Sequence, residues 1–337
     1  MATAFRRIQV GRETTRGTEV NADKVLYGTM TVQPQLTLYR PEDERNSLAQ
    51  YYRSEPVGHA ATSRYTSDCT AEQLTHFLSM CLCAEATADT SDYTIATFDP
   101  SVTGNVQKSY SVEYGDNTQS WVMTGTQVSS IELGIQMRAP VSMNVDLFSN
   151  FPEKSTFISD PGDLTVTPMI ADSGVFTMDG TWANAGTTIK GDSANEVQLA
   201  GGTIRLNSGL QQVRRLTTAN TTGTYNPSHV VENKRSHTMD LDLIVTSGWV
   251  TDVYDAYVAQ TSKAIRIKFT AAANGIESGH TQEVEISMFG KFTNINELFS
   301  DSEGDSMVRC TFESCDDGSG NEVEVKTKYK TSDVATL

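Results

Sequence analysis

Apolar and polar residues alternate along much of the chain, in both of its halves. The two-residue period covers residues 110–114, 131–137, 141–147, 265–269, 284–288 and 308–312. Successive side chains of a strand point to opposite faces of a sheet, so this period predicts antiparallel strands with one apolar face and one face in water. Thr, which favours such half-buried strands, is abundant. We therefore expect a mainly β protein.

Two segments have the period of an amphipathic helix instead. The first follows Thr70, which can form a capping box with Gln73. Its apolar stripe is Leu74, Phe77, Leu78, Cys81 and Leu82. The second follows Ser247–Gly248, and its stripe is Val250, Val253, Tyr254, Tyr257 and Val258. Each position of the second stripe lies 176 residues after its counterpart, and both stripes have helical spacing. His76 lies off the first stripe and is expected in solvent, whereas Cys81 is expected in the core.

The equal spacing of the two helices suggests an internal repeat. Residues 28–32 match 202–206 at an offset of 174. Gly125 matches Gly290 at 165, and Ser142–Met143 matches Ser306–Met307 at 164. The order of predicted elements is the same in both halves. We expect two tandem domains, each a β-sandwich or open barrel with one packed α-helix.

Breaks in the pattern give the expected boundaries. Residues 1–24 are interpreted as an N-terminal arm, 25–150 as the first domain, 151–165 as a linker, 166–315 as the second domain and 316–337 as a polar tail with a strand possible at 323–329. Two long polar loops, 41–60 and 217–233, occupy equivalent places in the two halves. Loops of that length in a compact domain are commonly functional.

Composition narrows the classes of function. Lys and Arg number 26 and Asp and Glu 42, which gives a net charge of −16 and argues against a surface that grips nucleic acid. No apolar run is long enough for a membrane-spanning helix, and the first residues lack the apolar core of a signal peptide. The five cysteines are expected to be free thiols in a reducing compartment.

The sequence contains no recognisable catalytic constellation. None of the five histidines has metal-ligand spacing to another ligand, and no nucleophile elbow or phosphate-binding glycine loop is present. The segment Asp301–Asp305 is interpreted as a polar turn, with a cation loop as the alternative. We expect a protein that is not an enzyme and has no cofactor; a hydrolase with an unrecognised site is a remaining alternative.

Three stretches carry a resemblance to a known family. They are VGRETTRGTEVNADKVLYGTMTVQP (10–34), GDNTQSWVMTGTQVSSIELGIQMRAPVSMNVDLFSNFP (115–152) and VFTMDGTWANAGTTIKGDSANEVQLAGGTIRLNSGL (175–210). Together with the order of elements, they resemble tail tube (major tail) proteins of long, non-contractile-tailed bacteriophages, with the tube domain duplicated. The resemblance is diffuse and covers nearly the whole chain.

The resemblance implies a structural role in a virion tail, assembled in the cytoplasm of the bacterial host. Such proteins form rings of six units with about 24 inner strands, and the rings stack into a tube around a tape-measure protein. Tail-end proteins are further implied partners. The genome leaves through the lumen, without sequence-specific binding. With two units per chain, a trimer would give a pseudo-sixfold ring; a hexamer with one unit lining the lumen is the alternative. No membrane is involved.

Candidate surface residues follow from these expectations. The candidates for contacts between rings are Glu42, Glu44, Arg45, Tyr51, Tyr52, Arg53, Tyr225 and His229. The candidates for a lumen or outer wall are Ser142, Asn144, Asp146, Glu283 and Glu285. The alternative function is a tail-tip or fibre protein that binds a host receptor or glycan. That alternative needs an aromatic surface, for which Tyr110, Tyr114 and Trp121 are candidates, although alternation directs Tyr110 and Tyr114 inward.

Overall fold

The computed structural model describes residues 6–41, 51, 53–82, 86–90, 92–100, 107–116, 118–157, 161–164, 166–193, 195–213, 229–271, 276, 280–296, 300–302 and 305–331. Strands hold 58% of the described residues and helices 10%, so the prediction of a mainly β protein is confirmed. The strands are β1 (Arg7–Arg12), β2 (Lys24–Leu26), β3 (Thr29–Tyr39), β4 (Glu55–Asp68), β5 (Ala86–Asp89), β6 (Tyr93–Phe98), β7 (Tyr110–Gly115), β8 (Ser120–Gln136), β9 (Ser142–Ser149), β10 (Glu153–Ser155), β11 (Gly162–Asp163), β12 (Met169–Asp179), β13 (Ile189–Lys190), β14 (Gln198–Asn207), β15 (Leu210–Val213), β16 (His229–Glu232), β17 (Thr238–Ile244), β18 (Lys263–Ala271), β19 (Glu283–Ile295), β20 (Ser300–Ser302), β21 (Asp305–Ser314) and β22 (Val323–Lys330).

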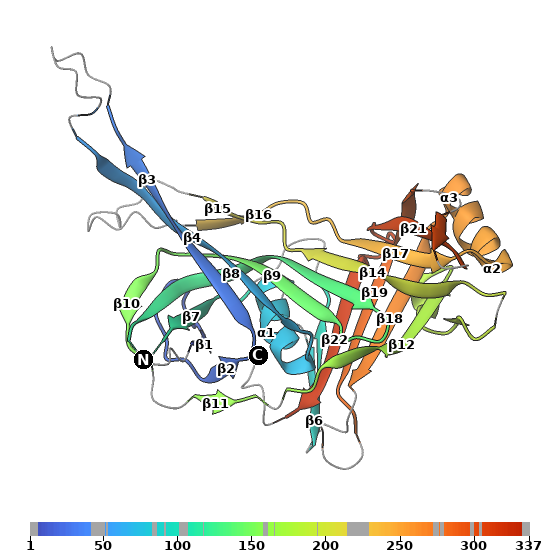
Figure 1. Ribbon diagram of the computed structural model, residues 1–337, viewed down its shortest axis with the longest axis horizontal. Coiled ribbons are helices and arrows are strands. Elements are labelled where there is room, and N and C mark those ends of the chain that lie inside the picture. The colour runs from blue at the N-terminus through green and yellow to red at the C-terminus, as the bar shows by residue number, and fades with distance from the viewer. Residues whose placement is uncertain are drawn as a thin grey trace.

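One antiparallel sheet runs through both halves of the chain (Figure 1). Its strands pair in the order β3–β4–β9–β8–β14–β17–β21–β19. We call this the long sheet. The first four strands come from the first half and the last four from the second. Within the long sheet the halves meet at the pairing of β8 with β14, so the sheet crosses from one half to the other without a break.

Two shorter layers continue from the long sheet where β8 and β19 bend. Residues 120–126 of β8 pair with β7 and β10, and β7 continues to β1 and β2. Residues 283–290 of β19 pair with β18 and β22, which continue to β12 and β6. A β-bulge interrupts β8 between Val128 and Ser130, and another interrupts β19 between Phe292 and Asn294. Bulges bend a strand, which lets each strand leave the long sheet for a short layer.

The order of pairing is the same in the two halves. It is β3–β4–β9–β8–β7–β1 in the first and β14–β17–β21–β19–β18–β12 in the second. The helix after β4 begins behind Thr70 and the helix after β17 behind Thr246, a separation of 176 residues.

Strand register corrects two of the sequence matches by one residue. Asp68 pairs with Ser142, and its counterpart Ile244 pairs with Met307, so the offset between β9 and β21 is 165 rather than 164. The buried Met143 therefore corresponds to the buried Val308. The same strand pairings give an offset of 164 residues between β8 and β19 rather than 165, because Gln127 corresponds to Lys291. The sequence matches were made on identical residue types, which do not show on which face of the sheet each residue lies.

Helix α1 (Ala71–Cys81) begins as predicted. The Thr70 Oγ1 accepts a hydrogen bond from the Gln73 backbone N–H at 3.3 Å. The Gln73 side chain differs from the capping-box expectation: it donates to Thr70 Oγ1 and accepts from the Tyr27 N–H and the Tyr65 hydroxyl, each at 2.7 Å. All residues of α1 are buried, because the helix lies between β8 on one side and β22 and β6 on the other. The expectation that His76 is solvated is wrong, since only 2% of it is exposed. Cys81 is in the core, as predicted.

The second helix is continuous but irregular. It consists of α2 (Ser247–Trp249), a π-helical turn η3 (Val250–Tyr254) and α3 (Asp255–Ala259). Its buried residues are Trp249, Val253 and Ala256, whereas Val250 is 44% and Val258 64% exposed. The predicted stripe is therefore wrong at both ends. The wider π turn rotates the later residues relative to a 3.6-residue helix, which the periodicity assumed.

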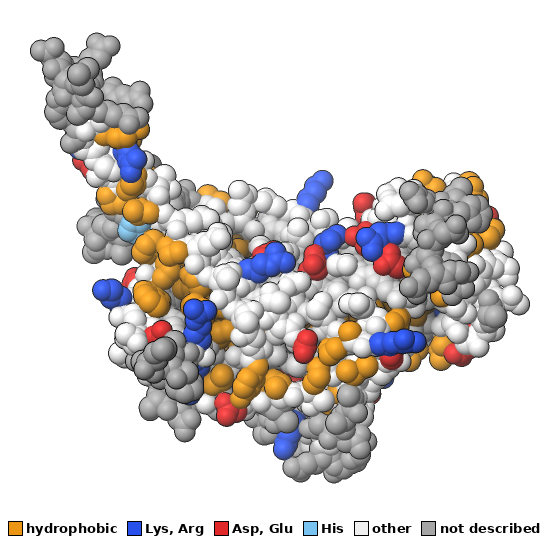
Figure 2. Space-filling view, viewed as in Figure 1, with side chains coloured by type: hydrophobic (Ala, Val, Ile, Leu, Met, Phe, Trp, Pro, Cys, Tyr) orange, Lys and Arg blue, Asp and Glu red, His pale blue; other side chains and the backbone are white. Residues whose placement is uncertain are grey.

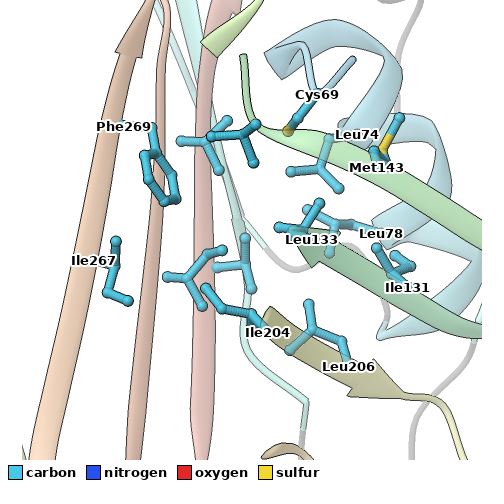
Figure 3. Close-up of a cluster of buried hydrophobic side chains, with 14 of the residues drawn as sticks. Cys69, Leu74, Leu78, Ile131, Leu133, Met143, Ile204, Leu206, Ile267 and Phe269 are labelled. Atoms are coloured by element: carbon cyan, nitrogen blue, oxygen red, sulfur yellow. The ribbon is translucent and has the colours of Figure 1, made fainter. Parts of the chain in front are cut away.

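The core is shared by the two halves. A single cluster of buried side chains includes residues of α1, the long sheet and both short layers. Figure 3 shows Leu74 and Leu78 of α1 facing Ile131 and Leu133 of β8 and Ile204 and Leu206 of β14, with Ile267 and Phe269 of β18 opposite.

Both chain ends and the presumed linker contain ordered strands, which corrects three boundaries. In the expected arm, β1 pairs with β2 and β7 and buries Ile8 and Val10. The presumed linker contains β10 and β11. In the expected tail, β22 lies between β19 and β6 and buries Val323, Val325 and Tyr329. β1, β10 and β11 are short, so their apolar content was too low to mark them, whereas the strand suggested at 323–329 is confirmed as β22.

Candidate assembly surfaces

The β3–β4 hairpin projects from one end of the body (Figure 1). Leu36 and Tyr39 are each 50% exposed and Val57 is 44% exposed. Figure 2 shows apolar side chains on the stem of the hairpin and on the adjoining body. A two-stranded hairpin alone is only marginally stable in water, and exposed apolar patches mark contact sites. The hairpin is therefore a candidate for contact with another protein surface.

An apolar groove lies at the foot of this hairpin. It has a volume of about 340 Å³ and is lined by Val32, Pro34, Tyr114, Trp121, Met123, Phe151 and Pro152. Tyr114 and Trp121 are paired residues of β7 and β8. Tyr110, the third aromatic candidate, is buried elsewhere, with its hydroxyl 3.1 Å from Ser79 Oγ. The groove thus brings together two of the three predicted aromatics, and its lining is almost wholly apolar.

Few of the predicted contact residues lie in the described ranges. Arg40 stands 5.3 Å above the ring of Tyr51, and Arg53 is exposed. His229 begins β16 and pairs with Val213 of β15, which forms a second two-stranded stem. Glu42, Glu44, Arg45, Tyr52 and Tyr225 lie outside the described residues.

The long sheet has one polar face that spans both halves. Its side chains include Thr29, Thr31, Thr62, Arg64, Ser130, Glu132, Ser142, Asn144, Asp146, Thr203, Arg205, Asp240, Asp242, Arg309 and Thr311. Arg205 contacts Glu132 at 3.0 Å and Asp240 at 2.8 Å. Arg309 contacts Asp242 at 2.7 Å. Positive and negative side chains also lie next to each other in the space-filling view (Figure 2). This face is hydrophilic, and its arginines are matched by carboxylates.

The five wall candidates divide between two faces. Ser142, Asn144 and Asp146 lie on the polar face of the long sheet, where the Thr66 hydroxyl donates to Asn144 Oδ1 at 3.0 Å. Glu283 and Glu285 lie in the second short layer. There they form ion pairs with Lys268 at 2.9 Å and Arg266 at 3.3 Å. Sequence alternation could not separate the two faces, because the bend in β19 places its ends in different layers.

Candidate chemistry is sparse in the described part of the chain. No three of its His, Cys, Asp and Glu residues cluster in a way that could hold a metal ion. Burial raises the pKa of the Cys69 thiol to about 12 and that of Cys310 to about 11, so both are protonated and poor nucleophiles at neutral pH. The segment Asp301–Asp305 joins β20 to β21, with Glu303 and Gly304 outside the described residues. None of the helices in the described ranges combines the length and apolar character needed to cross a bilayer.

Comparison with known proteins found no matching family model and no matching curated protein.

Two buried histidines predict a specific dependence of stability on pH. His76 lies against Lys24 and Tyr110, and burial lowers its pKa from 6.5 to about 4. Burial and Arg235 lower the pKa of His237 to about 3. Both rings are therefore neutral in the fold. Below pH 6.5 a histidine becomes protonated in the unfolded chain but stays neutral in the fold, which favours unfolding. The stability is therefore at its full value above pH 6.5 and decreases as the pH falls from 6.5 to the folded-state pKa.

We expect the free energy of unfolding to fall by about 2–3 kcal/mol per histidine between pH 7 and pH 4.5. This range lies above the ordinary pKa of carboxylates, so the histidines dominate it. Urea unfolding at several pH values measures the effect. The variant His76→Gln should lose about half of the pH dependence, while His280→Gln, at a half-buried histidine that packs edge-on against Tyr93, should retain it. The prediction would be contradicted if the free energy of unfolding changed equally with pH in the parent protein and in His76→Gln.

Proposed function

We propose that this protein is a structural subunit that assembles with copies of itself into rings, which stack into the tail tube of a bacteriophage. The observation that carries the proposal is the long sheet. Within the described residues, β3 pairs only with β4, and residues 294–295 of β19 pair only with β21. The sheet therefore ends in two open edges. Open edges favour pairing with another chain, and closure into a barrel removes them.

The repeated pairing order supports a duplicated unit within the chain. Each half supplies four strands to the long sheet and one strand that bends into a short layer, so we infer two tandem sandwich-like domains. Three chains with eight strands each would supply 24 strands, the number that the family resemblance implies. This count favours a trimeric ring over a hexamer in which only one unit lines the lumen.

The polar face of the long sheet is the proposed lumen wall. Its exposed Thr, Ser and Asn side chains are uncharged, and the arginines at positions 64, 205 and 309 each face a carboxylate. A wall whose arginines face carboxylates gives DNA phosphates few points of adhesion, since phosphate binding depends on Lys and Arg. Under this proposal Glu283 and Glu285 belong to the outer wall, and DNA passes without sequence-specific contact.

Partners and location follow from the same proposal. The tube would surround a tape-measure protein and end on other tail proteins, within a virion tail assembled in the host cytoplasm. The projecting hairpin would contact the neighbouring ring, because it exposes apolar side chains beyond the body.

A receptor-binding tip or fibre protein is the second candidate function, favoured by the groove that contains Tyr114 and Trp121. Carbohydrate sites combine aromatic rings with several polar groups, and the lining of this groove offers little besides the Tyr hydroxyl and Trp N–H. This composition favours an apolar protein contact over a glycan. Binding on a glycan array, with no self-assembly, would support the second candidate.

Negative-stain electron microscopy of the purified protein tests the proposed function. We expect closed rings with a central hole, and tubes of stacked rings at higher concentration. Image averaging gives the rotational symmetry. A monodisperse monomer at every concentration and salt condition tested would contradict the proposal.

A further inference from the structure

We infer that β3 of one copy pairs with β19 of the next copy, in the register that β14 and β8 adopt within one chain. This inference rests on the proposed function and specifies the contact between subunits. The partner is a second copy of this chain. The argument starts from the β8–β14 pairing, which already joins one unit to the next.

The internal junction has a defined register. Leu206 pairs with Ile131, Arg205 with Glu132, and Asn207 with Ser130. Leu206 and Ile131 are fully buried on the core side of the sheet. Arg205 and Glu132 form their ion pair on the polar face. The ladder continues to the Ser208 N–H, which donates to the Ser129 carbonyl at 3.0 Å.

The repeat transfers this register to the open edges. Thr66 pairs with Thr29, and its counterpart Asp242 pairs with Gly201, so the strand pairings give an offset of 172 between β3 and β14 rather than the 174 of the sequence match. The offset between β8 and β19 is 164. The predicted pairs between copies are therefore Pro34 with Ile295, Gln33 with Asn296 and Gln35 with Asn294. A shift of one residue would place apolar side chains on the polar face, because strand periodicity fixes the side.

Burial at the two edges fits this pairing. Val32 and Ile295 are only partly buried and pack against the edge of the core, whereas their internal counterparts Ile204 and Ile131 are fully buried. A neighbouring strand would complete their burial. Thr31, Gln33, Asn294 and Asn296 are exposed, as residues on the polar face should be.

The backbone groups at the two edges are also oriented for pairing. The Asn296 N–H donates to the Arg309 carbonyl of β21, so the N–H of the preceding residue, Ile295, points to the open edge. On β3, Pro34 corresponds to Leu206 and has no N–H. Proline is tolerated on an edge strand, and its carbonyl can still accept a hydrogen bond from the Ile295 N–H.

Disulfide trapping tests the register. Gln33 and Asn296 correspond to Arg205 and Glu132, a pair without mutual backbone hydrogen bonds, in which the Cβ atoms lie closest. The double variant Gln33→Cys/Asn296→Cys is purified, assembled and oxidised, and its products are separated on a non-reducing gel. The matched control is Thr29→Cys/Asn296→Cys, in which one cysteine is moved along β3 by about 13 Å. The parent protein reports any cross-linking by native cysteines.

We expect about tenfold more cross-linked product in the test pair than in the control pair, because disulfides require close Cβ atoms. Each chain carries both cysteines, so complete oxidation of a ring gives a covalent trimer as the largest product, or a hexamer if six chains close the ring. Rings that form by microscopy but do not cross-link would overturn this junction while leaving the proposed function standing. Equal cross-linking of the control pair would overturn the register. Absence of both rings and cross-links would overturn both inferences.

Discussion

Tubes should disappear while rings remain when Leu36, Tyr39 and Val57 are all replaced by threonine. These side chains are between 44% and 50% exposed on the projecting hairpin. Threonine preserves the strand but removes most of the apolar surface. Each hairpin should lose about 3 kcal/mol of contact energy, and a ring held by three hairpins about 9 kcal/mol. With that loss, rings should no longer stack at any protein concentration that can be reached in practice.

Negative-stain microscopy and sedimentation at matched concentrations measure the effect. The control variant Val175→Thr/Ile189→Thr removes apolar side chains of similar exposure, 39% and 48%, from the second short layer. It should form normal tubes. Normal tubes in the triple variant would show that the hairpin does not hold rings together, and loss of rings as well would place the hairpin within the ring.

Replacement of Glu13 by alanine should lower the free energy of unfolding by about 3–5 kcal/mol. Glu13 is 5% exposed, and its two carboxylate oxygens accept four hydrogen bonds. The donors are the N–H groups of Gly17 and Gly125, each at 2.7 Å, and the hydroxyls of Ser109 and Ser111 at 2.7 and 3.0 Å. Alanine leaves three of these donors, on Ser109, Ser111 and Gly125, buried without an acceptor.

Urea unfolding at a fixed protein concentration measures this loss, because assembly adds concentration-dependent stability. Glu19→Ala is the matched control, since Glu19 is exposed and its removal changes the net charge equally. It should alter stability by less than about 0.5 kcal/mol. Equal urea midpoints for the two variants would mean that the hydrogen bonds of Glu13 contribute little to the free energy of unfolding.

The sequence was most informative where one face of a strand is buried and the other is in water. β9 and the residues of β8 in the long sheet follow the two-residue period closely, and Thr70 caps α1 as predicted. Prediction failed where tertiary packing covers both faces. All of α1 is buried, and Ser111 and Glu113 of β7 are buried together with Tyr110 and Val112. A local period cannot indicate a second covering layer.

The candidate surfaces were harder to predict than the strands. Sequence spacing marked the loop after β3 but not the exposed apolar side chains on its stem. Nor could it show that β8 and β19 each belong to two layers, since the bends depend on bulges near Ser129 and Thr293. The groove was suggested only by Tyr114 and Trp121, because its other walls come from segments far apart in sequence.

The covalent connection between the two halves has a consequence for assembly kinetics. If a ring contains three chains, half of its six seams, those of the β8–β14 type, form during folding and are independent of concentration. Only three encounters between molecules are then needed, which lowers the reaction order of closure. Incomplete rings should be correspondingly rare intermediates, and a dilute pool of subunits can still complete a ring.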